Sequence, residues 1–237
     1  MRNIDFLKED YVSIWYLNIR EDAGYYNFLY SLLSEDEKHK ASRFKFQNDR
    51  VTSVLARGSL RLLLSKQLDC NAKDITFYYG EYGKPSLIKN NKTLKFNVSH
   101  SKDIIVIALC NNYDIGVDIE YIKRDFDVFD IVENYFSKKE IKALNSLPKP
   151  EQTAAFFRGW TRKEAFIKAK AKGLSFPLDS FSVSIDSDDK AELYETIWDV
   201  NEKASWNISP IIIAKDYKAA VAVKGKIKTS KHLRFKL

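Results

Sequence analysis

The middle of the chain reads Ile104-Ile105-Val106-Ile107-Ala108-Leu109-Cys110, then Asn111-Asn112-Tyr113-Asp114, then Ile115-Gly116-Val117-Asp118-Ile119-Glu120-Tyr121. The first segment is continuous, apolar and rich in β-branched residues, which is typical of a buried strand. The last segment predicts a second strand. The two strands form either a hairpin or a crossover between two halves of the chain. The turn between them is the best candidate for a domain boundary.

Faint internal echoes on either side of this turn indicate two related α/β units, with coincidence as the alternative. The matched segments are Ser34-Glu35-Asp36-Glu37 with Ser137-Lys138-Lys139-Glu140, Arg57-Gly58 and Arg61 with Arg158-Gly159 and Arg162, and Phe96-Asn97-Val98-Ser99 with Phe181-Ser182-Val183-Ser184. We therefore expect an N-terminal α/β half at 1–112 and a C-terminal α/β half at 113–225. A basic tail at 226–237 is expected to be a solvated terminus.

Two long helices are predicted, one at 49–68 and one at 151–172. Apolar residues recur at helical spacing in both segments. Gly173 is expected to cap the end of the second helix. The serines of the first echoed pair, Ser34 and Ser137, each begin a pattern that is typical of a capping box.

The composition is that of a globular protein and excludes several other classes. The 237 residues are 45% hydrophobic and 30% charged, with 5 prolines and 8 glycines, which excludes a mostly disordered or collagen-like chain. The longest wholly apolar run is far shorter than the ~20 residues of a membrane-crossing helix. With 2 cysteines, no metal spacing and no secretory signal, we expect a reducing, cytoplasmic setting. The net charge of +7 favours anionic partners, whether nucleic acid, a nucleotide-containing small molecule, an acidic protein or a membrane surface.

Asp118 and Glu120 alternate with Val117 and Ile119, so the two carboxylates share one face of their strand. At a separation of ~5 Å the carboxylates would repel each other by about 3 kcal/mol at an effective dielectric constant of about 20. Two interpretations remain open. The face is either hydrated, or it is a site for a hard metal ion such as Mg²⁺, which takes oxygen ligands.

Glu164 supplies a third acid on the side of its helix that also bears Trp160 and Lys168. The common alternative is an intrahelical Glu164–Lys168 pair. Lys163 adds a second cation next to Glu164 in the sequence.

Three other features offer groups that bind anions. His100 and its neighbouring serines, in Asn97-Val98-Ser99-His100-Ser101, can donate to phosphate oxygens, although a lone histidine is more often structural. Gly83-Lys84-Pro85 is a turn that contains a cation. Arg50, Arg57 and Arg61 line one edge of the first long helix, either as side chains at the border of the core or as an anion-binding edge.

The chain resembles the 4′-phosphopantetheinyl transferases of the Sfp type from about residue 30 to residue 185. The resemblance rests on the order and spacing of five motifs: Gly83-Lys84-Pro85, Phe96-Asn97-Val98-Ser99-His100-Ser101, Gly116-Val117-Asp118-Ile119-Glu120, Phe136-Ser137-Lys138-Lys139-Glu140 and Trp160-Thr161-Arg162-Lys163-Glu164-Ala165-Phe166-Ile167-Lys168. The acidic motif and the motif that ends at Lys168 are the most specific of the five.

The resemblance implies an α/β (α+β) fold, namely the pseudo-dimer of two similar halves in one chain that is the 4′-phosphopantetheinyl transferase fold, with coenzyme A between the halves. It implies a monomeric, cytoplasmic transferase, a holo-[acyl-carrier-protein] synthase. Such enzymes move the 4′-phosphopantetheine group of coenzyme A to a serine of an apo acyl, peptidyl or aryl carrier protein and release adenosine 3′,5′-bisphosphate. The implied metal is Mg²⁺, with Mn²⁺ as a substitute, and nonribosomal peptide or polyketide biosynthesis is the implied setting.

The resemblance also implies roles for individual residues. Asp118, Glu120 and Glu164 match residues that hold Mg²⁺ with the pyrophosphate, and Lys168 matches a residue that contacts phosphate. Lys84 and Pro85 match residues beside the adenine, Ser99 and His100 match phosphate contacts, and Lys40, Arg43 and Arg50 are candidates for the 3′-phosphate. Glu140 matches an acid near the metal site and equally fits the partner of Ser137 in a capping box.

The expected base is Glu164, or a water that it orients, which accepts the proton of the carrier serine. Lys168 and His100 are expected to stabilise charge on the phosphate oxygens. A basic rim would steer an acidic carrier protein, and part of 121–139 is the expected docking surface. Two alternatives are a nucleic-acid-binding module, which lacks any recognisable motif here, and a catalytically silent relative that binds without transferring. We expect neither a nucleic acid nor a membrane as partner.

Overall fold

The computed structural model describes residues 10–88, 93–124, 127–173 and 175–237. The strands are β1 (Tyr11–Asn18), β2 (Phe77–Tyr79), β3 (Pro85–Leu87), β4 (Leu94–Ser101), β5 (Ile104–Asn111), β6 (Ile115–Tyr121), β7 (Phe181–Val183), β8 (Leu193–Thr196), β9 (Trp206–Pro210), β10 (Tyr217–Lys224) and β11 (Thr229–Arg234). The α-helices are α1 (Tyr26–Ser31), α2 (Glu35–Ser42), α3 (Gln47–Leu68), α4 (Phe129–Tyr135), α5 (Lys138–Ser146) and α6 (Lys149–Lys170). No helix of these described ranges is long and apolar enough to cross a membrane.

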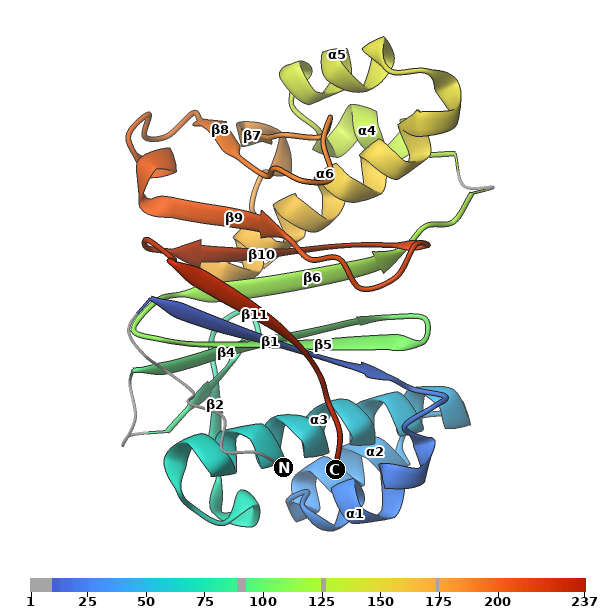
Figure 1. The fold of residues 1–237 in the computed structure, drawn as a ribbon, viewed down its shortest axis with the longest axis vertical. Coiled ribbons are helices and arrows are strands. Elements are labelled where there is room, and N and C mark those ends of the chain that lie inside the picture. Colours follow the sequence, from blue (N-terminus) through green and yellow to red (C-terminus); the bar gives the residue numbers. More distant parts are fainter. Residues whose placement is uncertain (1–9, 89–92, 125–126, 174) are drawn as a thin grey trace.

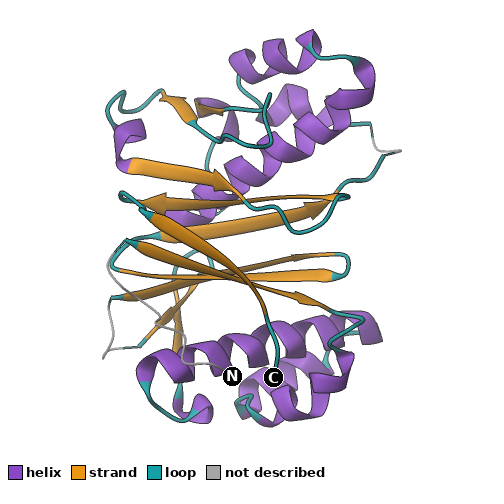
Figure 2. Ribbon diagram, viewed as in Figure 1, coloured by secondary structure: helices purple, strands orange, loops and turns teal. Residues whose placement is uncertain are grey.

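Two sheets lie face to face in the middle of the molecule, and helices cover the outer face of each sheet (Figures 1 and 2). One apolar core fills the space between the sheets and contains Val106, Val117 and Val221. A second core lies between the first sheet and α3, and a third lies between the second sheet and α6. The fold therefore has four layers, helix–sheet–sheet–helix.

The two halves repeat the same order of elements. The first half has β1, α1–α3, the hairpin β2–β3, then β4 and β5, and the second half has β6, α4–α6, the hairpin β7–β8, then β9 and β10. The sheets have matching orders, β1-β5-β4 and β6-β10-β9, with antiparallel neighbours. Both long helices, α3 and α6, have 22 residues. The expected α/β pseudo-dimer is thus confirmed.

The structure confirms some of the local expectations about the repeat and corrects others. The predicted capping boxes at Ser34 and Ser137 are both formed. The echo between 96–99 and 181–184 is wrong, because the first segment lies in β4 whereas the second begins in the hairpin strand β7; by topology the counterpart of β4 is β9. Strands β5 and β6 belong to different sheets, so their connection is the crossover and not a hairpin. The left-handed residue that caps α6 is Ala171 (φ +53°), and Gly173 (φ +64°) follows it in the turn.

The basic tail does not end in solvent as a free terminus. Residues 229–234 form β11, which pairs in parallel with β1 from Tyr11 opposite Thr229 to Tyr16 opposite Arg234. Phe235 is fully buried in the core under α3, and Arg234 Nη1 lies 2.6 Å from Asp22 Oδ2. The end of the chain therefore returns from the second half to the first, as the red strand in Figure 1 shows.

Helix α6 lies directly on strand β6 at Gly116. A Cβ atom at this position would lie 2.1 Å from the Ala165 carbonyl oxygen and 2.4 Å from the Ala169 amide nitrogen. Only a glycine permits this approach, because real Cβ atoms do not come so close to backbone atoms. Gly116 thereby sets the distance between α6 and the strand that bears Asp118 and Glu120.

A buried ion pair ties α5 to α6. Lys163 Nζ lies 2.8 Å from Glu140 Oε2 and also donates to the carbonyls of Leu178 and Phe181. The other oxygen of Glu140 accepts a bond from the Val183 amide. The first half has an equivalent ion pair between α3 and the capping box of α2. Arg61 Nε lies 2.6 Å from Glu37 Oε2, and Glu37 is the glutamate of that capping box.

Replacing Gly116 by alanine tests the close approach of α6. We expect Gly116→Ala to destabilise the protein by about 1–3 kcal/mol or more, because the added methyl group forces the helix away from the strand. Urea unfolding measures the change. Gly24→Ala is the control, since nothing lies within 4 Å of a Cβ atom there. Equal effects of the two substitutions would contradict this account.

Removing the cation of the buried pair tests its role in stability. Lys163→Met leaves the Glu140 carboxylate buried without its partner, and we expect a loss of about 3–5 kcal/mol in the free energy of unfolding. The double variant Glu140→Gln/Lys163→Met should recover part of that loss, because no charge then stays buried. Unchanged stability of the single variant would show that the pair is not needed.

Candidate functional site

Acidic side chains of β6 and α6 meet in one open cavity. Val117 and Ile119 face the core between the sheets, so Asp118 and Glu120 face α6, as the alternation predicts. The cavity has a volume of about 370 Å³. Its lining, which we name the acidic cavity, consists of Val98, Ser99, His100, Asp118, Glu120, Trp160, Glu164 and Lys168. The three acids that the sequence singles out thus share one cavity.

A row of side chains on β4 holds the acids of β6 in place. Ser99 Oγ donates to Asp118 Oδ1 at 2.8 Å, and Ser101 Oγ donates to Glu120 Oε2 at 2.7 Å. Asn97 Oδ1 accepts a bond from the Val117 amide at 2.8 Å. These contacts join the edge strands of the two sheets, so the acidic cavity lies where the two halves meet.

Lys168 links the helix to both strands. Its Nζ lies 2.5 Å from Asp118 Oδ1 and 3.2 Å from Ser99 Oγ. In the part of the chain that the structure describes, no Glu164–Lys168 ion pair is formed, so the common intrahelical alternative is not what is seen. The cation of α6 instead approaches the strand acid, which compensates part of the cost of burying that charge.

Two carboxylate oxygens in the acidic cavity are buried and lack a hydrogen-bond partner among the described residues, Asp118 Oδ2 and Glu164 Oε1. A buried acceptor without a partner costs about 1–3 kcal/mol. Burial, with the nearby Asp118 carboxylate, raises the pKa of Glu164 to about 7. Burial also raises the pKa of Asp118 and of Glu120. The cavity is therefore short of positive charge.

The donor set fits a hard divalent cation, because carboxylate oxygens without partners are the ligands that such a cation prefers. As the side chains lie, however, no group of three or more His, Cys, Asp or Glu residues within the described ranges is able to hold a metal ion. The Lys168 ammonium is the cation next to Asp118 in this arrangement. A metal site formed by Asp118, Glu120 and Glu164 stays a prediction.

A second cavity of about 370 Å³ adjoins the acidic cavity and shares Val98 and His100 with it. We name it the α3 cavity, since it lies between α3, β4 and the hairpin β2–β3. Its other lining residues are Leu33, Glu37, Lys40, Phe44, Asp49, Thr52, Ser53, Ala56, Arg57, Leu60, Tyr79, Pro85 and Asn97. Partial burial and the nearby Lys168 ammonium lower the pKa of His100, so its imidazole is mainly neutral at pH 7.

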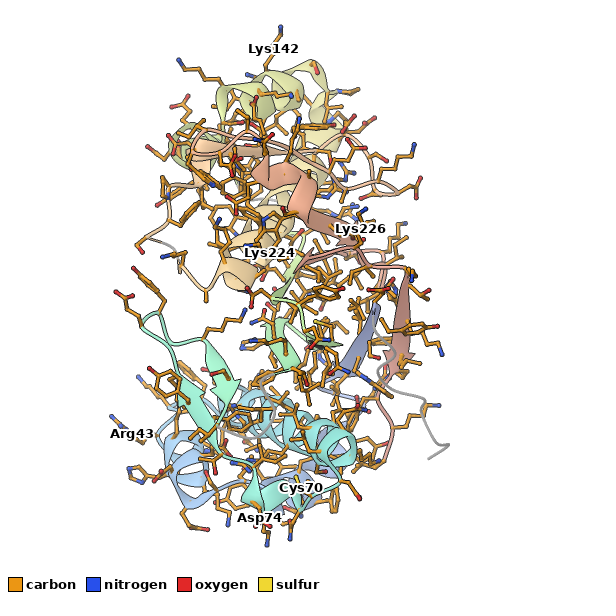
Figure 3. All side chains as sticks on the ribbon, turned by 90° about the vertical axis from the view of Figure 1, so that its left-hand side faces the viewer. Arg43, Cys70, Asp74, Lys142, Lys224 and Lys226 are labelled. Atoms are coloured by element: carbon orange, nitrogen blue, oxygen red, sulfur yellow. The ribbon has the colours of Figure 1, made fainter. Side chains whose placement is uncertain are left out.

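Of the three cations expected near the 3′-phosphate, only one lines the α3 cavity among the described residues. Lys40 lines the α3 cavity, whereas Arg43 and Arg50 are not among the described residues that line it. Figure 3 shows Arg43 at the outer edge of the N-terminal half, and Arg50 Nη2 donates to the Phe44 carbonyl. Arg57 does line the cavity. The sequence indicates Arg57 only as part of an arginine edge, because helical spacing alone does not show which face meets a cavity.

Lys84 and Pro85 both line a further cavity of about 220 Å³, which lies between the hairpin β2–β3 and the end of α6. Pro85 lines the α3 cavity, while Lys84 Nζ donates to the carbonyls of Ile115 (2.8 Å) and Ala169 (3.2 Å). Burial lowers the pKa of Lys84 to about 8. The Ala169 carbonyl belongs to the last turn of α6, where carbonyls lack partners within the helix. Lys84 therefore fastens the hairpin to the second half.

Two further candidates have structural partners. Arg61 donates to the carbonyls of Ala72 and Ile75 and pairs with Glu37. Glu140 has its capping-box and Lys163 contacts, and it is not among the described residues that line the acidic cavity. Of its two expected roles, the capping role is the one seen in the structure.

Comparison with known proteins gives the family. Residues 114–222 match the model of the 4′-phosphopantetheinyl transferase superfamily, and residues 21–112 match that of the 4′-phosphopantetheinyl transferase N-terminal region. The 4′-phosphopantetheinyl transferase HetI of Nostoc sp. is 30% identical over 221 residues, which cover 92% of this chain and 90% of HetI. The 4′-phosphopantetheinyl transferase Sfp of Bacillus subtilis is 37% identical over 69% of this chain and 71% of its own length, and ffp of Bacillus subtilis is 39% identical over 70% and 72%. The chain therefore belongs to the 4′-phosphopantetheinyl transferase family and is an Sfp-like enzyme of that family.

Proposed function

We propose that the enzyme transfers the 4′-phosphopantetheine group of coenzyme A to a serine of an apo carrier protein, depends on Mg²⁺ and releases adenosine 3′,5′-bisphosphate. One observation supports this most strongly: a cavity with three carboxylates and one lysine adjoins a second cavity with further cations. A pyrophosphate with a separate phosphomonoester needs two such neighbouring regions. The names of the relatives supply the group that is transferred.

Asp118, Glu120 and Glu164 would hold the Mg²⁺ ion. Bound there, the ion would offset the negative charge of the pyrophosphate and of the departing bisphosphate. Their oxygens without partners, Asp118 Oδ2 and Glu164 Oε1, are the natural ligands. Ser99 and Ser101 would keep the two strand carboxylates oriented, since each already donates to one of them.

The chain's own residues would act on the two reacting groups. Lys168 would turn its ammonium from Asp118 toward the phosphate oxygens and stabilise the charge on the leaving group. Glu164 would accept the proton of the carrier serine, whose oxygen attacks the phosphorus that bears the pantetheine. His100, which lines both cavities, would donate to a phosphate oxygen between them. Holding the carrier serine and coenzyme A in the right relative orientation would account for much of the acceleration of the transfer reaction.

We also propose a monomer. The acidic cavity takes its residues from β4, β6 and α6, which belong to both halves of a single chain. No second copy is needed to complete it.

The carrier protein is proposed to dock near the segment 121–139. Lys123 and Arg124 follow β6, and both are exposed, with Arg124 Nη2 3.0 Å from Asp216 Oδ1. Helix α4 exposes Phe129 (39%) and Tyr135 (43%) close to this basic pair in the sequence. Residues 125–126 of the segment lie outside the described ranges. A basic pair followed in the sequence by exposed apolar side chains suits an acidic helical partner.

A transfer assay tests the proposed function. Incubation with coenzyme A, Mg²⁺ and a panel of apo carriers should add the mass of phosphopantetheine to a carrier, and a chelator should stop the reaction. Glu164→Gln should lower turnover by about 100-fold or more, in the range that general-base groups contribute. Mass spectrometry of the carrier measures both results. A Glu164→Gln enzyme with near-full, Mg²⁺-dependent turnover would remove Glu164 from the base role.

Charge reversal tests the docking surface. Lys123→Glu/Arg124→Glu should raise KM for the carrier about tenfold and leave KM for coenzyme A unchanged, because the pair steers only the acidic partner. Lys73→Glu/Lys203→Glu is a matched control with the same charge change at two other exposed positions. Equal changes in the two KM values of the first variant would refute the docking site.

A further inference from the structure

A cavity of about 370 Å³ on the second half has no role in the reaction proposed above. It lies between the middle of α6, the start of β10 and the turn that joins β9 to β10, and we name it the β10 cavity. One side of it is apolar, with three consecutive isoleucines at 211–213, and the other side bears the cations Arg158, Arg162 and Lys218. The described residues that line it are separate from those of the acidic cavity and the α3 cavity.

The positive charge of the β10 cavity exceeds what its carboxylate neutralises. Asp188 is the only acid in the lining that the described residues form. Arg158 binds it with two nitrogens, at 2.8 and 3.0 Å, and Lys218 Nζ lies 2.6 Å from one of the same oxygens. Two cations therefore share a single carboxylate.

Arg162 adds a third cation, which is buried without a carboxylate beside it. Arg162 is 1% exposed, and its guanidinium donates to the carbonyls of Ser184 and Ser187. Within the described part of the chain it forms no ion pair. Burial and the neighbouring Arg158 guanidinium lower the pKa of Arg162 to about 10. A buried charge without an opposite charge is costly, so the cavity favours an anionic group from outside.

The β10 cavity lies one strand away from the acidic cavity. In the antiparallel pairing of β10 with β6, Lys218 is directly opposite Glu120. Side chains of directly opposite residues lie on the same face of a sheet, with Cβ atoms about 4.5–5.5 Å apart. Both cavities also take residues from α6. A large molecule that reaches the acidic cavity with one group can therefore cover the β10 cavity with another.

The turn between β9 and β10 is joined to the segment that is proposed for docking. The Ile122 amide donates to the Asp216 carbonyl at 2.9 Å, and Arg124 Nη2 lies 3.0 Å from Asp216 Oδ1. At the β10 cavity this turn presents Ile212, which is 72% exposed, and the exposed Lys215. An exposed apolar side chain with polar groups around it is typical of a surface that binds another protein.

We infer that the β10 cavity is part of the docking surface for the carrier protein, where an acidic side chain of the carrier enters the cavity and an apolar side chain packs on Ile212. The identity of the partner rests on the proposed function, and the charge of the cavity gives the chemistry of the segment that it binds. A stable interface buries about 800 Å² on each partner, so a protein that places its serine in the acidic cavity extends well beyond it.

Binding of an apo carrier in the absence of coenzyme A tests the inference without any transfer step. The probes are the apo carriers of the panel that the wild-type enzyme modifies. Ile212→Ser/Lys215→Glu changes two exposed side chains at the cavity and leaves its buried residues in place. We expect the dissociation constant for the carrier to rise about tenfold or more, while that for coenzyme A stays within about twofold. Titration calorimetry on the full chain measures both constants.

Two more variants make the test specific. Ile197→Ser/Lys203→Glu is the matched control, because Ile197 is 77% exposed, Lys203 is exposed, and both lie between β8 and β9. It should leave both dissociation constants unchanged. Lys215→Glu alone should weaken the dependence of carrier binding on salt, since one cation fewer attracts the acidic partner, and it keeps the test valid if the double variant does not fold.

Unchanged carrier affinity in Ile212→Ser/Lys215→Glu would overturn the inference and leave the proposed function intact, since transfer would still occur. An equal loss of affinity for the carrier and for coenzyme A, or an equal effect of the control pair, would also overturn it. A wild-type enzyme that binds and modifies no carrier of the panel would overturn the inference together with the proposed function.

Discussion

The close packing of α6 on β6 at Gly116 is the constraint on which the candidate site depends. Because Gly116 has no side chain, the helix approaches until its backbone touches the strand. The strand's next two residues on that face are Asp118 and Glu120, and the helix presents Glu164 and Lys168 to the same cavity. Packing energy of the hydrophobic cores thus holds like charges together that would separate in water. This burial is why a cation is needed there and why Lys168 takes that position in the structure.

The repeated fold explains why the site forms once and not twice. Each half supplies the same strands, long helix and capping-box glutamate with a cation from that helix. The edges of the sheets differ, however. The outer edge of β6 lies at the seam with β4, whereas β11 pairs along the corresponding edge of its counterpart β1. In the first half, the edge of β1 that corresponds to the acid-bearing edge of β6 is therefore covered by β11. Among the described residues, only the second half contributes acidic side chains to the cavity between the halves.

Patterns with a short range were predictable from the sequence, and placements that depend on distant contacts were not. Alternation along 115–121 predicted which face bears the acids, and two capping boxes marked helix starts, because each depends on neighbouring residues only. The strand at 229–234 was missed, since its partner β1 lies at the other end of the chain. The bonds from Lys84 to two carbonyls of the second half depend on residues far away in the sequence, and Arg57 meets a cavity that helical spacing alone does not reveal.

A crystal structure of the protein with coenzyme A and Mn²⁺, recorded with anomalous diffraction from the metal, tests the proposed metal site most directly. We expect one strong anomalous peak in the acidic cavity, in contact with carboxylate oxygens of Asp118, Glu120 and Glu164, with Lys168 moved from Asp118 to a phosphate oxygen. A metal peak that touches none of these three acids, or a Lys168–Asp118 pair that is unchanged beside bound coenzyme A, would contradict it.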